Sequence, residues 1–185
     1  MPSSVLSLTI DTHVTLKELE LSDVLPVFTA IDNGRAYLSE WLPFVDKTKD
    51  IGFTLGFVES YLNSDRKDLT FAIYVDDEFA GLIGLKDTDL LNRKTEIGYW
   101  LSERFQHRGI MTKSCSGLID YCFNVLNMNR IQLKAGVGNK KSRAVAERLG
   151  FKFEGVEREG ELLTHGFIDL AVYGILQSEF SNSNL

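Results

Sequence analysis

The chain contains little cysteine, histidine or proline, and these shortages exclude several classes of protein. It has two cysteines, three histidines and three prolines in 185 residues. Cys115 and Cys122 are seven positions apart in one helical run, which separates their Cα atoms by about 10 Å and puts a disulfide out of reach. We therefore expect both thiols to pack in the core. His13, His107 and His165 lack the spacing of metal ligands, so no metal is predicted.

The sequence also lacks long apolar runs and an excess of positive charge. No apolar segment approaches the roughly 18 residues of a membrane span, and the first residues lack the basic and apolar regions of a signal peptide. A cytoplasmic location is therefore expected. The net charge of −6 and the isoelectric point near 5.1 disfavour nucleic-acid binding, which requires many cations to neutralise phosphates. We predict neither a nucleic-acid partner nor a membrane partner.

The composition and the order of elements predict one α/β domain over residues 1–185. Hydrophobic residues make up 44% of the chain and charged residues 25%, which is typical of a globular domain. Strands in a meander followed by strand-helix-strand-helix-strand predict a mixed α+β sheet flanked by helices. The predicted strands span residues 13–19, 69–75, 79–85, 95–101, 130–137, 151–158 and 167–176. The predicted helices span residues 22–33, 35–40, 51–62, 111–126 and 140–149.

Several residues mark the ends of these elements. Ser22 and Asp50 are predicted helix caps, and Gly81 and Gly84 indicate a bulge or a close backbone contact within a strand. The last two strands are expected to turn around Gly160 and Gly166. Asp169 is expected to make an edge or turn contact, a loop is expected over residues 87–94, and residues 178–185 should form a frayed tail.

The segment 106–112, Gln-His-Arg-Gly-Ile-Met-Thr, joins the strand 96–101 to the longest amphipathic helix. The first N–H groups of a helix have no intrahelical partner and attract anions. Gly109 permits close approach of the backbone, and basic residues surround it in an otherwise acidic chain. Phosphate binding is one interpretation, and an ordinary loop with a solvated basic face is the other.

This segment, following Glu-Ile-Gly-Tyr-Trp at residues 96–100, resembles the acetyl-CoA pyrophosphate loop of the GNAT acetyltransferases. Met111 stands where the common pattern has Gly or Ala, as is usual in the RimJ/RimL-like branch. The resemblance spans residues 5–180 and implies a central, mostly antiparallel sheet flanked by helices. It implies pantetheine on the backbone of Trp100, Leu101 and Ser102. It implies pyrophosphate on Gln106, His107, Arg108, Gly109, Ile110, Met111 and Thr112.

A second motif, Asn139-Lys-Lys-Ser142 followed by Arg-Leu-Gly-Phe at 148–151, also resembles the family. By this resemblance Asn139 and Lys141 contact acetyl-CoA, and the Ser142 hydroxyl protonates the departing thiolate. Many members use a tyrosine after this motif for that proton, but this chain has phenylalanine at 151 and 153. Water is the alternative proton donor. From the residues alone, Asn139 is a good helix cap and the lysines form a charged helix face.

The resemblance assigns Glu96 as the general base, whereas the residues alone also fit a solvated acid at a strand end. Trp41 lies in Trp-Leu-Pro-Phe at 41–44, a segment that edges the acceptor cleft in RimJ/RimL-like proteins and is otherwise a hydrophobic plug. Tyr99 and His165 are predicted to line the same cleft, and each also fits a structural role.

The implied function is acetyl-CoA-dependent N-acetylation of a primary amine by direct attack in a ternary complex. The first choice of acceptor is the N-terminal amine of a protein such as a ribosomal protein. The alternatives are a small-molecule amine acetyltransferase acting on a polyamine, amino sugar or antibiotic, and a non-catalytic CoA-binding module. An acid-rich cleft would favour polyamines, and sequence alone does not place Glu40, Asp46 and Glu161. A homodimer is compatible with the resemblance.

Overall fold

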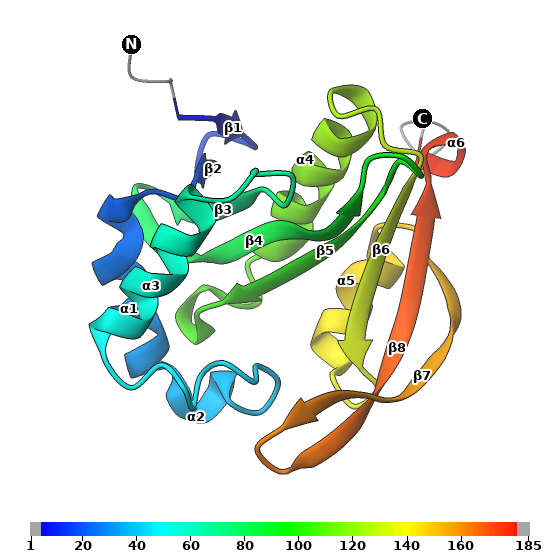
Figure 1. The fold of residues 1–185 in the computed structure, drawn as a ribbon. Coiled ribbons are helices and arrows are strands. Elements are labelled where there is room, and N and C mark those ends of the chain that lie inside the picture. The colour runs from blue at the N-terminus through cyan, green and yellow to red at the C-terminus, as the bar shows by residue number, and fades with distance from the viewer. Residues whose placement is uncertain (1–4, 181–185) are drawn as a thin grey trace.

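The computed structural model describes residues 5–180, in which an eight-stranded mixed sheet carries helices on both faces (Figure 1). The strand order is β1-β2-β3-β4-β5-β6-β8-β7, and every neighbouring pair is antiparallel except β5 and β6. The predicted fold class is confirmed. No helix among the described residues is long and apolar enough to cross a bilayer.

The strands are β1 (Ser7–Thr9), β2 (Val14–Glu18), β3 (Thr70–Val75), β4 (Glu78–Asp89), β5 (Lys94–Leu101), β6 (Arg130–Gly136), β7 (Lys152–Leu163) and β8 (Gly166–Leu176). The helices are α1 (Val24–Asn33), α2 (Arg35–Leu38), α3 (Ile51–Leu62), α4 (Ile110–Asn124), α5 (Lys140–Arg148) and α6 (Gln177–Phe180). Short 3₁₀ turns lie at Leu21–Asp23 and Glu103–Phe105.

The sheet separates two hydrophobic cores, because successive side chains of a strand point to opposite faces. In β5, Ile97 packs in the core that contains the apolar side of α4. Trp100 packs on the other face with residues of α1 and α3. Neighbouring side chains of β5 therefore lie in different cores, on opposite faces of the sheet.

β5 and β6 pair only at one end, and this opens the sheet. Lys94–Ile97 of β5 pair with Arg130–Leu133 of β6. Beyond that point β5 continues to pair with β4 as far as Leu101, and β6 continues with β8 as far as Gly136. The two strands therefore diverge (Figure 1). One backbone edge of residues 98–101 faces the gap without a strand partner.

The start of the first helix differs from the prediction. Ser22 lies inside the 3₁₀ turn rather than capping the helix, and α1 begins at Val24. The Asp23 carboxylate instead accepts a hydrogen bond from the Glu20 N–H at 2.8 Å. The predicted Ser22 cap is wrong because the acid one residue later reaches back to satisfy the turn.

Two strands are longer than their apolar patterns predicted. β4 continues to Asp89, so the predicted loop at 87–94 is partly strand, and β7 continues to Leu163. Gly160 therefore lies within β7, and the chain turns only before Gly166. Register shifts at Lys86/Asp89 and Glu157/Glu161 let pairing continue through polar residues, which hid these extensions from the sequence pattern.

Among the other predicted features of element ends, those at Gly81, Asp50 and Asp169 are confirmed and the tail is not. A Cβ on Gly81 would lie 2.2 Å from the Trp100 carbonyl oxygen, so the predicted close contact is confirmed. Asp50 caps α3 as predicted, and Asp169 accepts a hydrogen bond from Glu159 N–H at 2.8 Å. The predicted frayed tail is wrong at its start, where α6 forms, and residues 181–185 lie outside the described part of the chain. The short strand β1 had no pattern to reveal it.

Both cysteines are free and buried in the core, as predicted. Burial raises the pKa of the Cys122 thiol to about 12 and also raises that of Cys115. Because the thiolate is the reactive form, we expect neither thiol to react with Ellman's reagent in the native protein at pH 8. Both should react after unfolding in guanidinium. Stoichiometric reaction of the native protein within minutes would contradict this.

Candidate active site

The phosphate-loop segment forms the N-terminus of α4. Gly109 is the cap residue, with φ of +73°, in the left-handed region that favours glycine. A Cβ there would meet nothing within 4 Å, so glycine is required by conformation and not by crowding. The N–H groups of the first helical turn point out of the helix end, and they form the kind of cradle that binds an anion.

A cavity of about 260 Å³ lies in front of this helix end. Most of the residues predicted to bind acetyl-CoA line it. Ser102 and Arg108 lie outside its lining, although Ser102 Oγ is buried without a hydrogen-bond partner in the described residues. The predicted residues in the lining are Trp100, Leu101, Gln106, His107, Gly109, Ile110, Met111, Thr112, Asn139, Lys141 and Ser142.

Tyr37 of α2 also lines this cavity, and sequence reasoning missed it. Gln106 Nε2 donates to its hydroxyl, and Lys141 Nζ donates to Gln106 Oε1 at 2.9 Å. The same ammonium lies 5.5 Å from the centre of the Tyr37 ring. Burial raises the pKa of Tyr37, so its hydroxyl stays protonated at neutral pH. The contact joins three separate segments of the chain. α2 has only four residues, which is too short for a sequence pattern that would predict the contact.

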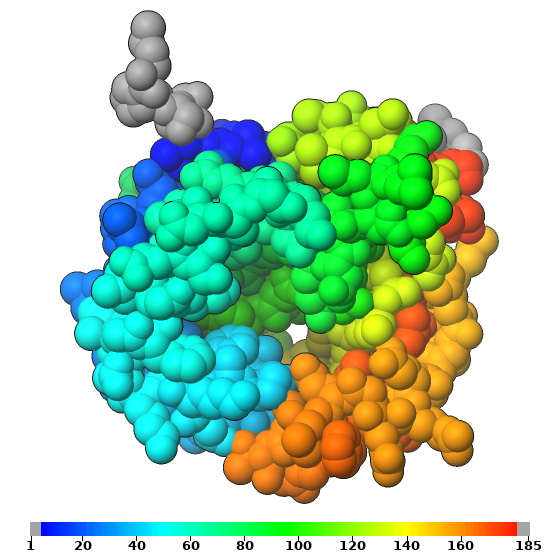
Figure 2. Space-filling view, viewed as in Figure 1, coloured from blue at the N-terminus to red at the C-terminus, as the bar shows by residue number. Residues whose placement is uncertain are grey.

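A second cavity, of about 800 Å³, lies on the α1–α3 side of the sheet. Figure 2 shows a hollow at the centre of this face, between the cyan segments, the green strands and the orange β7–β8 hairpin. The two cavities share the lining residues Trp41, Leu42, Tyr99, Trp100, Asn139 and Ser142. They therefore meet at the place where β5 and β6 diverge.

Tyr99 and Ser142 form the junction between the cavities. Their hydroxyl oxygens are 2.9 Å apart, and Tyr99 OH lies 3.2 Å from the Ser142 carbonyl oxygen. Asn139 Oδ1 accepts from Ser142 N–H at 3.1 Å and caps α5. Burial raises the pKa of Tyr99 well above its ordinary value. The pair therefore presents a protonated hydroxyl at the centre of the site.

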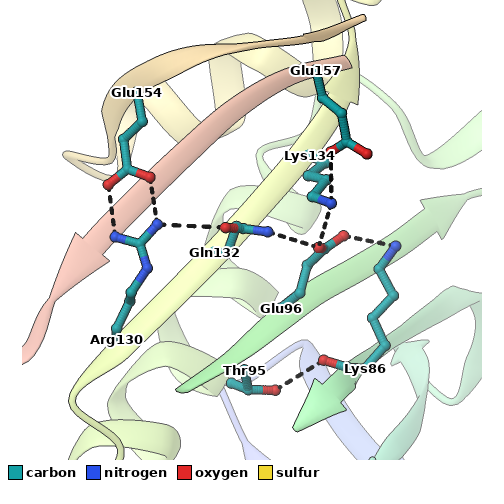
Figure 3. A network of polar contacts seen from close by, with 8 residues as sticks. All are labelled: Lys86, Thr95, Glu96, Arg130, Gln132, Lys134, Glu154 and Glu157. Carbon is teal, nitrogen blue, oxygen red and sulfur yellow. Dashed lines mark hydrogen bonds and ion pairs between the residues drawn. The ribbon is translucent and has the colours of Figure 1, made fainter. Parts of the chain in front are cut away.

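Glu96, the predicted base, is buried with 4% of its surface exposed and lines neither cavity. Lys86 Nζ lies 2.7 Å from Oε1 as an ion pair, outside hydrogen-bonding direction. Gln132 Nε2 donates to Oε2 at 3.1 Å, and Lys134 Nζ lies 3.8 Å from Oε2 (Figure 3). Both lysines line the second cavity, whereas the Glu96 carboxylate that they contact does not.

Glu161 of β7 is the carboxyl group that does line the second cavity. Burial raises its pKa, and the nearby Glu96 adds to this, while Lys86 and Lys134 partly oppose it. Glu40 and Asp46, the other acids whose position was open, are outside the lining. No local pattern places Glu161, because an irregular strand pairing brings it to the cavity.

The three predicted acceptor-site residues separate in the structure. Trp41 lines both cavities, and its ring lies 2.8 Å from where a Cβ on Gly136 would stand; glycine there lets the indole pack on the end of β6. Tyr99 is at the junction. His165 is exposed at the β7–β8 turn, outside both linings. The adjacent Thr164 hydroxyl hydrogen-bonds the Asp46 carboxylate.

Within residues 5–180, no group of three or more His, Cys, Asp or Glu side chains is arranged to hold a metal. The open edge of β5 and the helix-end cradle together fit a long ligand with amides and phosphates, such as CoA.

Known proteins resemble this chain over most of its length. Residues 13–152 match the family described as "Acetyltransferase (GNAT) domain". The putative ribosomal N-acetyltransferase YdaF of Bacillus subtilis (strain 168) is 33% identical over 92% of this chain and 95% of its own. The ribosomal-protein-serine acetyltransferase of Escherichia coli (strain K12) is 31% identical over 81% and 85%. A spermidine N(1)-acetyltransferase of the same strain is 27% identical over 84% and 79%.

Among solved structures, the ribosomal alpha-N-protein acetyltransferase RimL in complex with coenzyme A has a TM-score of 0.89. It is 25% identical and covers 92% of this chain and 98% of its own. The matched domain, the relatives and the shared architecture lead to one conclusion: the chain belongs to the GNAT family of N-acetyltransferases.

Proposed function

We propose that this protein transfers the acetyl group of acetyl-CoA directly to the N-terminal amine of a protein, with a ribosomal protein as the first candidate. The observation that carries this proposal is the meeting of two cavities at the Tyr99–Ser142 pair. One cavity ends at a helix N-terminus suited to anions, and the other is a larger, mostly apolar cleft. Such an arrangement brings an amine and a thioester together without an acyl-enzyme.

Acetyl-CoA supplies the activated acetyl group. The backbone of Trp100, Leu101 and Ser102 holds its pantetheine amides, much as another strand would. The segment 106–112 holds the pyrophosphate, and Asn139 and Lys141 complete the site. Ser142 donates the proton that the leaving sulfur needs, with water as the alternative donor. The Tyr99 hydroxyl, 2.9 Å from the Ser142 hydroxyl, supports Ser142 in this role.

Two carboxyl groups are candidates for the base that deprotonates the acceptor ammonium. Glu96 remains our prediction from the family motif. Glu161 is favoured by geometry, because it lines the acceptor cavity and has a raised pKa, which suits a general base. Glu96 is enclosed by Lys86 and Lys134, so we propose that it holds these lysines in place if Glu161 is the base.

The charges of the second cavity favour an acceptor with one ammonium group over a polyamine. Its charged lining residues are Lys86, Lys134 and Glu161. Glu96 and Glu157 are already paired with these lysines. A polyamine would find one acid for its several positive charges, whereas a peptide N-terminus has a single ammonium to place. The cavity charges therefore support a protein N-terminus, as in the names of the ribosomal-protein relatives, over spermidine as the acceptor.

A direct assay separates these functions. We expect thiol release from acetyl-CoA with short peptides that begin with Ser, Ala or Thr, at a kcat/KM at least tenfold higher than with spermidine. Lys86→Gln should narrow that ratio severalfold, because it removes a repulsive charge of the cavity. Arg93→Gln is the control: Arg93 binds the Asn127 carbonyl and lines neither cavity.

The remaining outcomes identify the alternatives. Preferential use of spermidine would show a polyamine acetyltransferase. Tight acetyl-CoA binding by calorimetry, without release by any acceptor, would favour the non-catalytic CoA-binding module.

A further inference from the structure

α3 forms one wall of the second cavity, and it carries an unusual hydroxyl. Thr54 lines the cavity with only 2% of its surface exposed. Its Oγ1 has no hydrogen-bond partner among the described residues. A threonine inside a helix can donate to the carbonyl one turn earlier, and Thr54 does not. A buried hydroxyl without a partner lowers stability, so its presence in the wall of this cavity calls for an explanation.

A second threonine in the same cavity shows that the fold can satisfy such a group. Thr48 is 1% exposed and also lines the cavity. Its hydroxyl donates to the Phe44 carbonyl at 2.9 Å. The two residues have the same chemistry and nearly the same burial, and they differ in whether the hydroxyl is already used by the protein.

The surroundings of Thr54 are apolar, which makes its hydroxyl the polar group of that wall. Phe53 and Phe57 of α3 and Phe44 of the preceding segment line the same cavity. In ligand sites of this kind, a few placed polar groups among apolar walls fix the orientation of the ligand.

We propose that the Thr54 hydroxyl binds the acceptor, by donating a hydrogen bond to a backbone carbonyl near the amine of the bound N-terminal peptide. This inference rests on the proposed function and narrows it. Every peptide N-terminus offers such a carbonyl, whatever its side chains, whereas a polyamine has none. Thr54 is thus a residue that selects peptides among amines.

The test uses Thr54→Val, which keeps the shape and removes the hydroxyl. The melting temperature should rise, because an unsatisfied buried hydroxyl is lost. The KM for the Ser-, Ala- or Thr-terminal peptide should rise about three- to tenfold, the size expected for one neutral hydrogen bond. The KM for acetyl-CoA should stay within about twofold. Thr54→Ser, which keeps the hydroxyl, should have the peptide KM of the wild type.

Thr48→Val is the matched control. It removes a hydroxyl that the protein itself uses, so the melting temperature should fall. A merely structural Thr54 would alter the melting temperature and leave the peptide KM unchanged, and that result overturns the proposal. If the wild type acetylates none of the peptides, the proposed function fails, and the assignment of Thr54 fails with it. If the wild type acetylates them and Thr54→Val does so with unchanged KM, only the Thr54 assignment fails.

Discussion

Replacing Gly109 with glutamate should weaken acetyl-CoA binding at least about a hundredfold, measured by titration calorimetry. Two effects add. A residue with a Cβ in the left-handed conformation costs about 1–2 kcal/mol, and Gly109 has φ of +73°. The new carboxylate would also stand before the helix end proposed to hold the pyrophosphate, and like charges about 5 Å apart repel by about 3 kcal/mol at an effective dielectric constant of 20.

Gly150→Glu is the matched control for this substitution. Gly150 has φ of +79°, and a Cβ there also meets nothing within 4 Å, but it follows α5 and lines neither cavity. It should lower stability while leaving acetyl-CoA affinity within about twofold. Gly109→Ala keeps the conformational cost without the charge and should give an intermediate loss. Unchanged affinity in Gly109→Glu would remove the phosphate-loop interpretation.

Glu161→Gln should lower kcat by about a hundredfold or more, the usual size of general base catalysis, and should remove the acidic limb of the pH–rate profile. The base must be deprotonated to act. The pKa of Glu161 is raised above its ordinary value, chiefly by burial, so the wild-type rate should climb as pH rises through that raised pKa. An amide does not titrate, so the variant should lack this climb.

Glu96→Gln is the comparison that decides between the two carboxyl groups. It leaves Lys86 and Lys134 without their shared partner, so it should lower stability while keeping the acidic limb. If the limb disappears in Glu96→Gln and persists in Glu161→Gln, then the base is Glu96, as the family motif predicts.

The raised pKa of Glu161 also gives a stability test with a defined sign. A carboxyl group whose pKa is higher in the folded state favours folding in its protonated form. Its favourable contribution is present below the unfolded pKa and is lost as pH rises through the folded pKa. Glu161→Gln should therefore melt at a higher temperature than the wild type at neutral pH, and the two should converge in acid.

The sequence revealed those parts of the site that lie within one continuous segment. The cradle at Gly109 was found because a strand, a glycine loop and a helix follow one another directly. Asn139 and Ser142 were found for the same reason, since they begin one helix. In each case, residues that are close in the sequence are also close in the structure.

The parts that sequence reasoning missed depend on packing between distant segments. Tyr37 reaches Gln106 only because α2 folds against the loop. Glu161 reaches the cleft through a register shift in the β7–β8 pair. The motif draws attention to Glu96 of β5, but the enclosure of its carboxylate by Lys86 and Lys134 depends on the alignment of three strands, which no local pattern records.

The divergence of β5 and β6 also determines where the sheet leaves a strand edge open. An unpaired strand edge normally attracts strands of other molecules and begins aggregation. Here the free edge of residues 98–101 lies in the interior of the sheet, between β4 and β6, rather than at its rim. An added strand would have to fit between β5 and β6, which are already held side by side at residues 94–97 and 130–133. The strands on either side therefore shield this free edge from pairing with strands of other molecules, whereas an edge at the rim of the sheet would be open to them.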